Sequence, residues 1–118
     1  MQMRNSPERR ANAMITKECK IFLCDCTEFV KQIPDESIQL IISSPPYCMG
    51  KEYEDTNNVQ DFLSAHLQIS ADLVRILKPG GSLCWQVGYH AKNSVLVPLD
   101  YLSHAEFSKY KELRLRNR

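Results

Sequence analysis

A polar loop with two consecutive prolines, Ser43-Ser44-Pro45-Pro46-Tyr47-Cys48, carries the residues with the clearest chemical meaning. A serine hydroxyl and a proline-locked carbonyl both accept hydrogen bonds. Two acceptors about 3 Å from one point suit an exocyclic amino group, which has two N–H donors. Acceptors placed out of the ring plane favour a pyramidal nitrogen with a localised lone pair. The loop is therefore predicted to activate an aromatic amine, with a purely structural turn as the alternative.

The same loop contains a ring that suits a planar base. Tyr47 offers a flat aromatic face beside the two acceptors. A base must leave the helical stack before its amino group can react, and stacking on an aromatic ring offsets part of that cost. The pattern therefore favours a flipped nucleobase as the substrate.

The element that must position this loop is a buried strand over residues 38–42. Its sequence, Ile-Gln-Leu-Ile-Ile, is short, apolar and β-branched. The prolines exclude a helix after it and push Ser44 toward an extended conformation. Open α/β sheets bind ligands at the carboxyl ends of their strands, which is where the loop lies.

The residues before this strand predict a second strand and a short helix. Residues 20–24 form an apolar run, and Thr27 is suited to cap a helix over 28–33. Residues 34–37 have the composition of a turn. The order strand, helix, strand indicates a βαβ unit and hence a parallel sheet.

The residues after the loop predict a long helix and a further strand. Residues 50–58 are polar and read as a surface loop, and Asn58 is suited to cap a helix with a broad apolar face. Lys78 is expected in its last turn, and Pro79-Gly80-Gly81 is expected to stop it. A strand over 82–87 follows.

The last third of the chain has a weaker pattern. Residues 90–94 are predicted to form a loop. A helical pattern lies within 96–113, with Pro98 suited to the first turn. Trp85 and Tyr89 are candidates for the border of a base pocket, with core packing as the alternative, and His66 is interpreted as a packed or edge histidine.

Composition limits the classes of protein and the partners. The 118 residues suggest one domain, and no apolar run approaches the roughly 20 residues that span a bilayer. The net charge of +1 gives no bulk attraction to nucleic acid. Residues 1–16 are expected to form a flexible basic arm. Arg114, Arg116 and Arg118 are expected to form a solvated face or to meet phosphate.

Cysteine usage indicates reduced thiols in a cytosol. The count of five is odd and no secretion signal precedes them. Cys24 and Cys26 lack a second pair or clustered histidines that would complete a tetrahedral site, so no metal is expected. Cys48 is not expected to act as a nucleophile.

Three segments in this order resemble the DNA amino-methyltransferases, which methylate N4 of cytosine or N6 of adenine with S-adenosylmethionine. They are residues 22–26, 38–47 and 77–83, and Lys51-Glu52-Tyr53 is also similar. The resemblance covers about residues 20–118 and is nearest the group whose catalytic motif precedes its cofactor motif. It implies a partial Rossmann-like α/β fold with a mostly parallel sheet, in which 17–118 form the N-terminal, catalytic-motif part of the domain.

The resemblance also implies roles for individual residues. Ser44, Pro45, Pro46 and Tyr47 would form the catalytic pocket for the target amine. Asp25 would bind the adenine or ribose part of S-adenosylmethionine, with a helix-capping role as its alternative. The Ser-Pro-Pro-Tyr form leans toward N4 of cytosine. Double-stranded DNA would be the partner, in the bacterial cytoplasm at the nucleoid, within restriction-modification.

The sequence departs from the family in what it lacks. The four glycines, at 50, 80, 81 and 88, do not form the Phe-x-Gly-x-Gly loop that holds the methionine moiety of the cofactor. We therefore expect a truncated or split enzyme that is inactive alone and needs a complementing C-terminal half or second subunit. A non-catalytic remnant or partner-binding fragment is one alternative. A nucleotide-binding α/β domain is another, although no phosphate-binding glycine loop is present.

Overall fold

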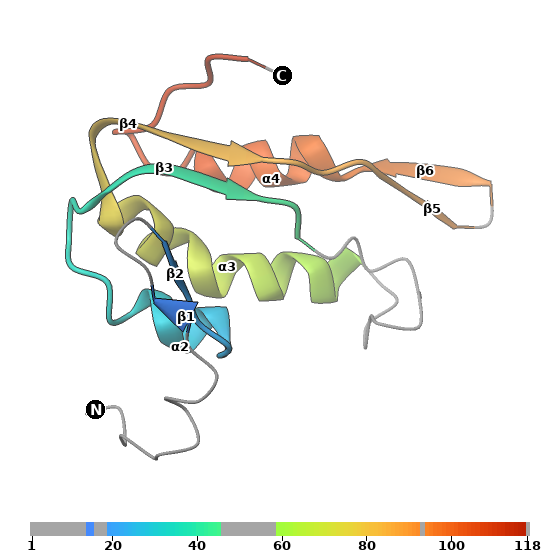
Figure 1. Cartoon of the computed structure of the whole chain (residues 1–118). Helices are drawn as coiled ribbons and strands as arrows, with labels where there is room; N and C mark the ends of the chain where they lie inside the picture. The colour runs from blue at the N-terminus through green and yellow to red at the C-terminus, as the bar shows by residue number, and fades with distance from the viewer. Residues whose placement is uncertain (1–13, 16–18, 46–58, 93, 118) are drawn as a thin grey trace.

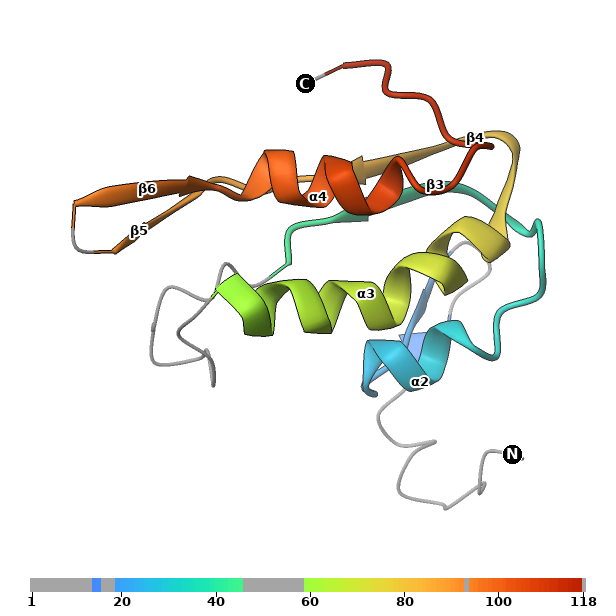
Figure 2. The same cartoon turned by 180° about the vertical axis from the view of Figure 1, so that it is seen from behind.

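The computed structural model describes residues 14–15, 19–45, 59–92 and 94–117, and shows a small α/β arrangement (Figures 1 and 2). Its elements, in chain order, are β1 (Met14–Ile15), β2 (Lys20–Ile21), α2 (Cys26–Val30), β3 (Ile38–Ser43), α3 (Val59–Ile76), β4 (Leu77–Trp85), β5 (Tyr89–Lys92), β6 (Val95–Pro98) and α4 (Leu99–Phe107). None of the described helices has both the length and the apolar character of a bilayer-spanning segment.

The central unit is β3–α3–β4, in which the two strands pair in parallel. From Leu40 opposite Ser82 to Ser43 opposite Trp85 the register is regular, and it shifts between Ile38 and Leu40. The predicted strand over 38–42 is confirmed, and its parallel pairing with β4 agrees with the predicted mostly parallel sheet. In Figure 1 the two strands run side by side above α3.

The helix-to-strand junction differs from its prediction. Helix α3 ends at Ile76 with Arg75 in its last turn, so Lys78 is not helical, and β4 already includes Pro79-Gly80-Gly81. Gly80 has a φ of +77°, which a side chain disfavours. A Cβ on Gly81 would lie 2.9 Å from the Lys78 carbonyl oxygen. The glycines thus let the chain bend closely against β3.

One face of this strand pair carries the main apolar cluster. Val30, Leu73 and Ile76 are buried there, and residues from both strands and from α4 pack against them, among them Ile41, Leu83, Trp85 and Phe107. The rings of Trp85 and Phe107 meet edge to face at 5.4 Å. Helices α3 and α4 therefore cover the same face of the sheet; Figure 2 shows α4 from its own side.

The opposite face of the strand pair is open among the described residues. Side chains alternate along a strand, so Leu40 and Ile42 point away from α3. Their relative exposures are 52% and 73%. Cys84, on β4 opposite Ile42, is also exposed.

A second apolar cluster lies where α3 and α4 meet the β5–β6 hairpin. Phe62 and Leu99 are fully buried, with Val87 and Val97 packed against them. The backbone amide of Leu99 donates to the Gly88 carbonyl at 3.2 Å, which fixes the start of α4 beside the end of the β4 segment.

A polar cluster also joins α3 to α4. The hydroxyl of buried Ser70 donates to Glu106 Oε1 at 3.1 Å and lies 3.0 Å from the Tyr110 hydroxyl. Lys109 Nζ pairs with Glu106 Oε2 at 2.5 Å. The buried carboxylate of Glu106 is thus compensated by Ser70 of α3 and by Lys109, which follows α4.

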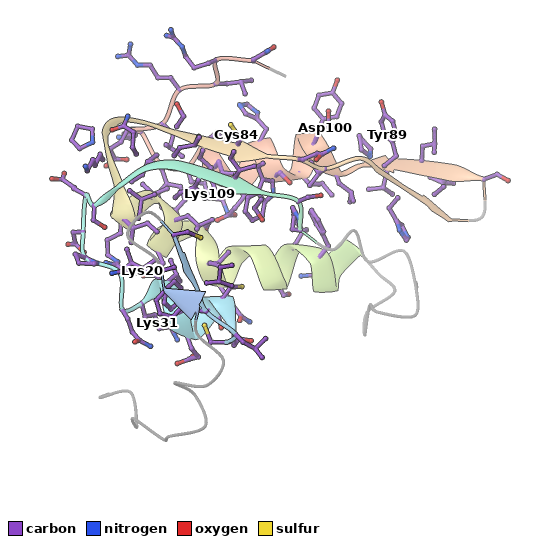
Figure 3. The ribbon with its side chains drawn as sticks, in the orientation of Figure 1. Lys20, Lys31, Cys84, Tyr89, Asp100 and Lys109 are labelled. Atoms are coloured by element: carbon purple, nitrogen blue, oxygen red, sulfur yellow. The ribbon has the colours of Figure 1, made fainter. Side chains whose placement is uncertain are left out.

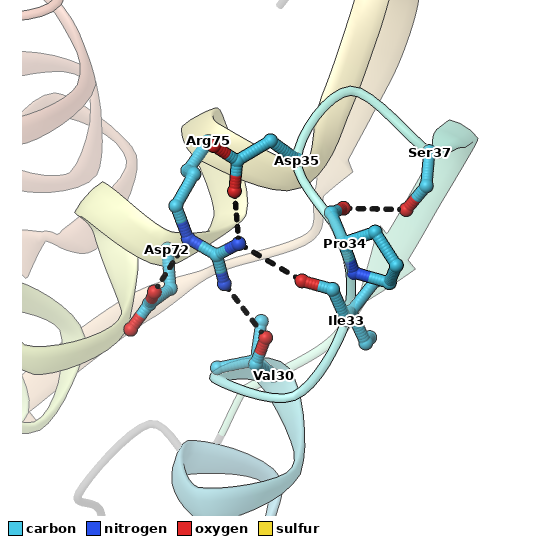
Figure 4. A network of polar contacts seen from close by, with 7 residues as sticks. All are labelled: Val30, Ile33, Pro34, Asp35, Ser37, Asp72 and Arg75. Carbon is cyan, nitrogen blue, oxygen red and sulfur yellow. Dashed lines mark hydrogen bonds and ion pairs between the residues drawn. The ribbon is translucent and has the colours of Figure 1, made fainter.

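The start of β3 is fixed by Arg75, whose guanidinium closes the end of α2 (Figure 4). It donates to the carbonyl oxygens of Val30 and Ile33 at 2.9 and 2.8 Å. It also pairs with Asp35 at 2.6 Å and Asp72 at 3.0 Å. The hydrogen bond to Asp35 is the largest cause of a raised pKa for Arg75, and the hydrogen bond to Asp72 is the second. The turn before β3 is therefore anchored to α3.

The N-terminal elements correct two predictions. The strand predicted over 20–24 is limited to Lys20–Ile21 and pairs in antiparallel fashion with β1, so it does not form a parallel unit with β3. The helix begins at Cys26, and Asp25, not Thr27, is its N-cap. Thr27 donates both its amide and its hydroxyl to Asp25, at 2.8 and 2.5 Å. Of the predicted arm over 1–16, only Met14 and Ile15 are described.

The last third also differs from its prediction. The predicted loop over 90–94 is mostly strand β5, which forms an antiparallel hairpin with β6. Ser94 at its turn has a φ of +63°. Helix α4 occupies Leu99–Phe107, and Pro98 is its N-cap rather than part of its first turn. The alternating pattern of the hairpin was hidden by its short strands, which are only four residues each.

Candidate active site

Ser44 and Pro45 follow β3 at the carboxyl edge of the parallel pair. The Gln86 amide donates to the Ser43 carbonyl at 2.8 Å, which holds the ends of β3 and β4 together. Ser44 is exposed and Pro45 is buried, and the Ser44 hydroxyl has no hydrogen-bond partner in the described chain. Pro46 and Tyr47 lie outside the described residues. The described half of the predicted pocket therefore presents an unengaged acceptor next to a fixed proline.

Asp25 lies on a different part of the fold, at the start of α2. Its carboxylate is exposed, and the hydrogen bonds from Thr27 lower its pKa, so it is ionised at neutral pH. No hydrogen bond or ion pair within the described residues joins it to Ser44 or Pro45. The capping alternative foreseen for Asp25 is thus present, and it leaves the carboxylate at the surface.

The two aromatic candidates for the border of a base pocket, Trp85 and Tyr89, differ in their packing. Trp85 packs in the main cluster against Phe107, as core packing predicts. Tyr89 is 60% exposed, so core packing does not describe it. Figure 3 shows Tyr89 beyond the carboxyl end of β4, at the start of the hairpin.

Two polar groups near the hairpin were missed by the sequence interpretation. His90 and Ser103 are buried, with relative exposures of 6% and 8%, and their side-chain polar atoms have no hydrogen-bond partner in the described chain. Ser103 lies four residues after buried Leu99 and three before buried Glu106, so helical spacing places the three on one face. The sequence contains this signal. His90 sits in a segment predicted as loop, so nothing signalled its burial.

Metal binding has no support in the described part of the chain. It holds no group of three histidine, cysteine, aspartate or glutamate side chains arranged to hold an ion. Cys24 and Cys26 are exposed thiols. The side chain of His66 and the whole of Cys48 lie outside the described residues.

Comparison with known proteins decides the family. A family model described as DNA methylase, that of the N6 and N4 methyltransferases, matches residues 38–115, which include β3, the proline motif, α3 and β4. The chain belongs to the DNA methylase family. The match begins at the first residue of β3, the strand that leads into the candidate site.

Individual relatives of this chain are type II methyltransferases. M.BglII of Bacillus subtilis is 37% identical over 82 residues, covering 69% of this chain and 23% of the relative. M.BamHI of Bacillus amyloliquefaciens is 38% identical over 68 residues, covering 54% and 16%. The chain therefore spans less than a quarter of either relative.

A solved structure supports the fold. The PvuII DNA methyltransferase, described as cytosine-N4-specific, superposes with a TM-score of 0.54 at 24% identity, covering 70% of this chain and 30% of that protein. The predicted family and the predicted partial α/β methyltransferase fold are confirmed. The roles of individual site residues stay predictions.

Proposed function

We propose that this chain is the catalytic-motif portion of an enzyme that transfers a methyl group from S-adenosylmethionine to an exocyclic amino group of a flipped base in DNA. The observation that carries the proposal is the exposed Ser44 hydroxyl, which lies beside buried Pro45 at the carboxyl edge of β3–β4, has no hydrogen-bond partner among the described residues and is inside the matched family region. DNA in the cytoplasm is the proposed partner, within a restriction-modification system.

In this proposal the proline loop binds and orients the amine. The Ser44 hydroxyl and the carbonyl next to Pro45 accept hydrogen bonds from the two N–H donors of the base. Fixed acceptors favour the pyramidal nitrogen because they need no reorganisation during the reaction. Tyr47 stacks on the base and offsets the cost of unstacking it. Gln86 supports the loop by holding the Ser43 carbonyl.

Asp25 fits the cofactor by the chemistry of its donor set. An exposed, ionised carboxylate accepts hydrogen bonds from ribose hydroxyls or from an amino group, and the Thr27 bonds restrict its rotation. We propose that it binds the adenosine part of S-adenosylmethionine. When bound, S-adenosylmethionine supplies the electrophilic methyl group.

We propose N4 of cytosine as the target atom and N6 of adenine as the second candidate. Two observations support the order: the Ser-Pro-Pro-Tyr form of the motif and the fold similarity to a cytosine-N4-specific enzyme. Both target atoms are exocyclic amines on planar rings, so the same loop serves either.

We also propose that these 118 residues have little activity by themselves. They contain no Phe-x-Gly-x-Gly loop for the methionine moiety, and their exposed sheet face at Leu40 and Ile42 suits a complementing polypeptide. A non-catalytic remnant is the competing proposal; it predicts that no complement restores methylation.

Calorimetric titration with S-adenosylmethionine tests the dependence on other segments. We expect binding too weak to measure at micromolar concentrations. A micromolar dissociation constant for the 118-residue chain would contradict the proposal that cofactor binding depends on other segments.

A complementation experiment tests the reaction. The chain is co-expressed with the part of M.BglII outside its aligned region, and modified nucleosides in cellular DNA are measured by mass spectrometry. We expect N4-methylcytosine, its loss with Ser44→Ala, and its retention with Ser108→Ala, a surface control. N6-methyladenine would reassign the base, and no modified base in any sample would favour the remnant.

A further inference from the structure

Two exposed cysteines flank the helix cap of α2. Cys24 and Cys26 stand on either side of Asp25, and both are exposed and outside any disulfide. Asp25 itself is extended, with φ −65° and ψ 128°. These angles are close to those of polyproline II, which has three residues per turn, so the side chains before and after Asp25 diverge. Only one residue separates the two exposed thiols along the chain.

The spacing of these thiols is close to what a disulfide needs. Two extended residues span at most about 7 Å between Cα atoms. Disulfide-linked residues have Cα atoms about 4.4–6.8 Å apart. Bond formation between Cys24 and Cys26 therefore requires at most a small closure of the segment, and the only residue between them that can supply it is Asp25.

The surrounding chain already folds back at this point. The rings of Phe22 and Phe29 lie 4.8 Å apart, one on each side of the Cys24–Cys26 segment. The two thiols therefore lie, in sequence, between two rings that pack on each other. Within the described residues no metal-binding group claims them.

We propose that Cys24 and Cys26 form a redox-modification site, at which a hydroperoxide converts the two thiols into an intramolecular disulfide that disrupts the Asp25 cap. One thiolate attacks the peroxide oxygen, giving a sulfenic acid and releasing the alcohol or water. The second thiol then attacks the sulfenic sulfur, forming the S–S bond and releasing water. The peroxide is reduced and the thiol pair is oxidised.

The bond and the cap compete because both depend on the backbone at Asp25. Its extended angles place the carboxylate over the Thr27 amide. Disulfide-linked residues have Cβ atoms about 3.5–4.5 Å apart, so turning the two diverging side chains toward each other rotates Asp25 and separates its carboxylate from Thr27. The inference goes beyond methyl transfer and does not depend on it; an effect on cofactor binding by Asp25 would follow only if the proposed function holds.

Peptide mapping of the unaltered chain tests the bond. Trypsin cuts after Lys20 and Lys31, and the peptide between them, residues 21–31, holds Cys24 and Cys26 and no other cysteine. The native chain is treated with hydrogen peroxide, its remaining thiols are alkylated, and the digest is weighed. We expect this peptide to lose two hydrogens and to take up no alkylating group, reversibly with dithiothreitol.

Amide exchange tests the coupling to the cap. In the oxidised chain the Thr27 amide is expected to exchange about five-fold faster, as is typical for loss of one capping bond. Cys26→Ser is the matched control: it cannot form the bond, so peroxide should leave Thr27 exchange unchanged. A peptide 21–31 that is doubly alkylated or linked to another peptide would overturn the site. A bond with unchanged Thr27 exchange would overturn the coupling.

Discussion

Two junctions between elements of this fold differ in whether their polar groups have hydrogen-bond partners. At the α2–α3 junction, Arg75 reaches two helix-end carbonyls and two carboxylates. At the hairpin junction, where β5 and β6 meet α4, His90 and Ser103 are buried, and their side-chain polar atoms have no hydrogen-bond partner among the described residues. The first junction is complete within the described chain and the second is not.

The difference shows which part of the fold stands on its own. Buried polar groups without partners cost about 1–3 kcal/mol each, so they weaken the hairpin junction. A two-stranded hairpin is also marginal by itself, and the β6 residues Val95 and Leu96 are exposed. The α2–α3 junction fixes the start of β3 and hence the strand that leads to Ser44, so the candidate site rests on the complete junction.

The largest expected effect concerns the core at the complete junction. Ile76→Ala removes a side chain that is 3% exposed, and we expect the free energy of unfolding to fall by about 2–5 kcal/mol. Urea denaturation followed by circular dichroism measures it. Ile42→Ala is the matched control: Ile42 is 73% exposed, so its change should stay within about 0.5 kcal/mol. Equal losses would show that the exposed face is buried in solution.

The next prediction addresses His90 at the hairpin junction. His90→Leu replaces a buried ring whose two nitrogens lack partners with an apolar side chain. We expect the free energy of unfolding to rise by about 1–3 kcal/mol in the same urea assay. His104→Leu, an exposed position on α4, should change it by less than about 0.5 kcal/mol. A destabilised His90→Leu chain would mean that the ring has partners in solution.

Substituting either of two serines in the α3–α4 region should change the free energy of unfolding, but in opposite directions. Ser70 bonds to Glu106, whereas the Ser103 hydroxyl has no partner in the described chain. Ser70→Ala should lower the free energy of unfolding by about 1 kcal/mol, and Ser103→Ala should raise it by a similar or smaller amount. Thermal denaturation of both variants in one buffer measures the pair. Two changes of the same sign would remove the distinction between the junctions.

The smallest effect is expected at the α2 cap and depends on pH. The folded pKa of Asp25 is lowered from 3.8 by its bonds from Thr27, so the carboxylate stabilises the folded chain above that pH. This contribution disappears as the pH falls through the lowered value. Asp25→Asn should therefore show a weaker dependence of the denaturation midpoint on pH between about 2 and 5. Identical pH profiles for both chains would show that the cap does not form.

The sequence by itself determined the elements whose signals are local. The apolar β-branched run at 38–42, the periodic apolar positions of α3 and the Lys-Pro-Gly-Gly segment each depend on neighbouring residues. They predicted a strand, a long helix and a further strand in this order, and the motif segments carried the resemblance to the family. The βαβ unit itself was predicted too early in the chain, over residues 20–42 instead of β3–α3–β4. The proline loop was placed at the correct strand end because its signals are local as well. Ser44 and Pro45 follow β3 as expected.

Only the tertiary structure decided how those elements meet. The pairing of β2 with β1, the formation of the hairpin, the burial of His90 and the choice of Asp25 as N-cap all depend on residues brought together from outside a local window or on competition between adjacent caps. Arg75 is the clearest case, since its partners at Val30, Ile33 and Asp35 are about 40 or more residues away in the chain. Such contacts form because hydrogen-bonding groups at helix ends must be satisfied, and which side chain does so is a property of the packed chain.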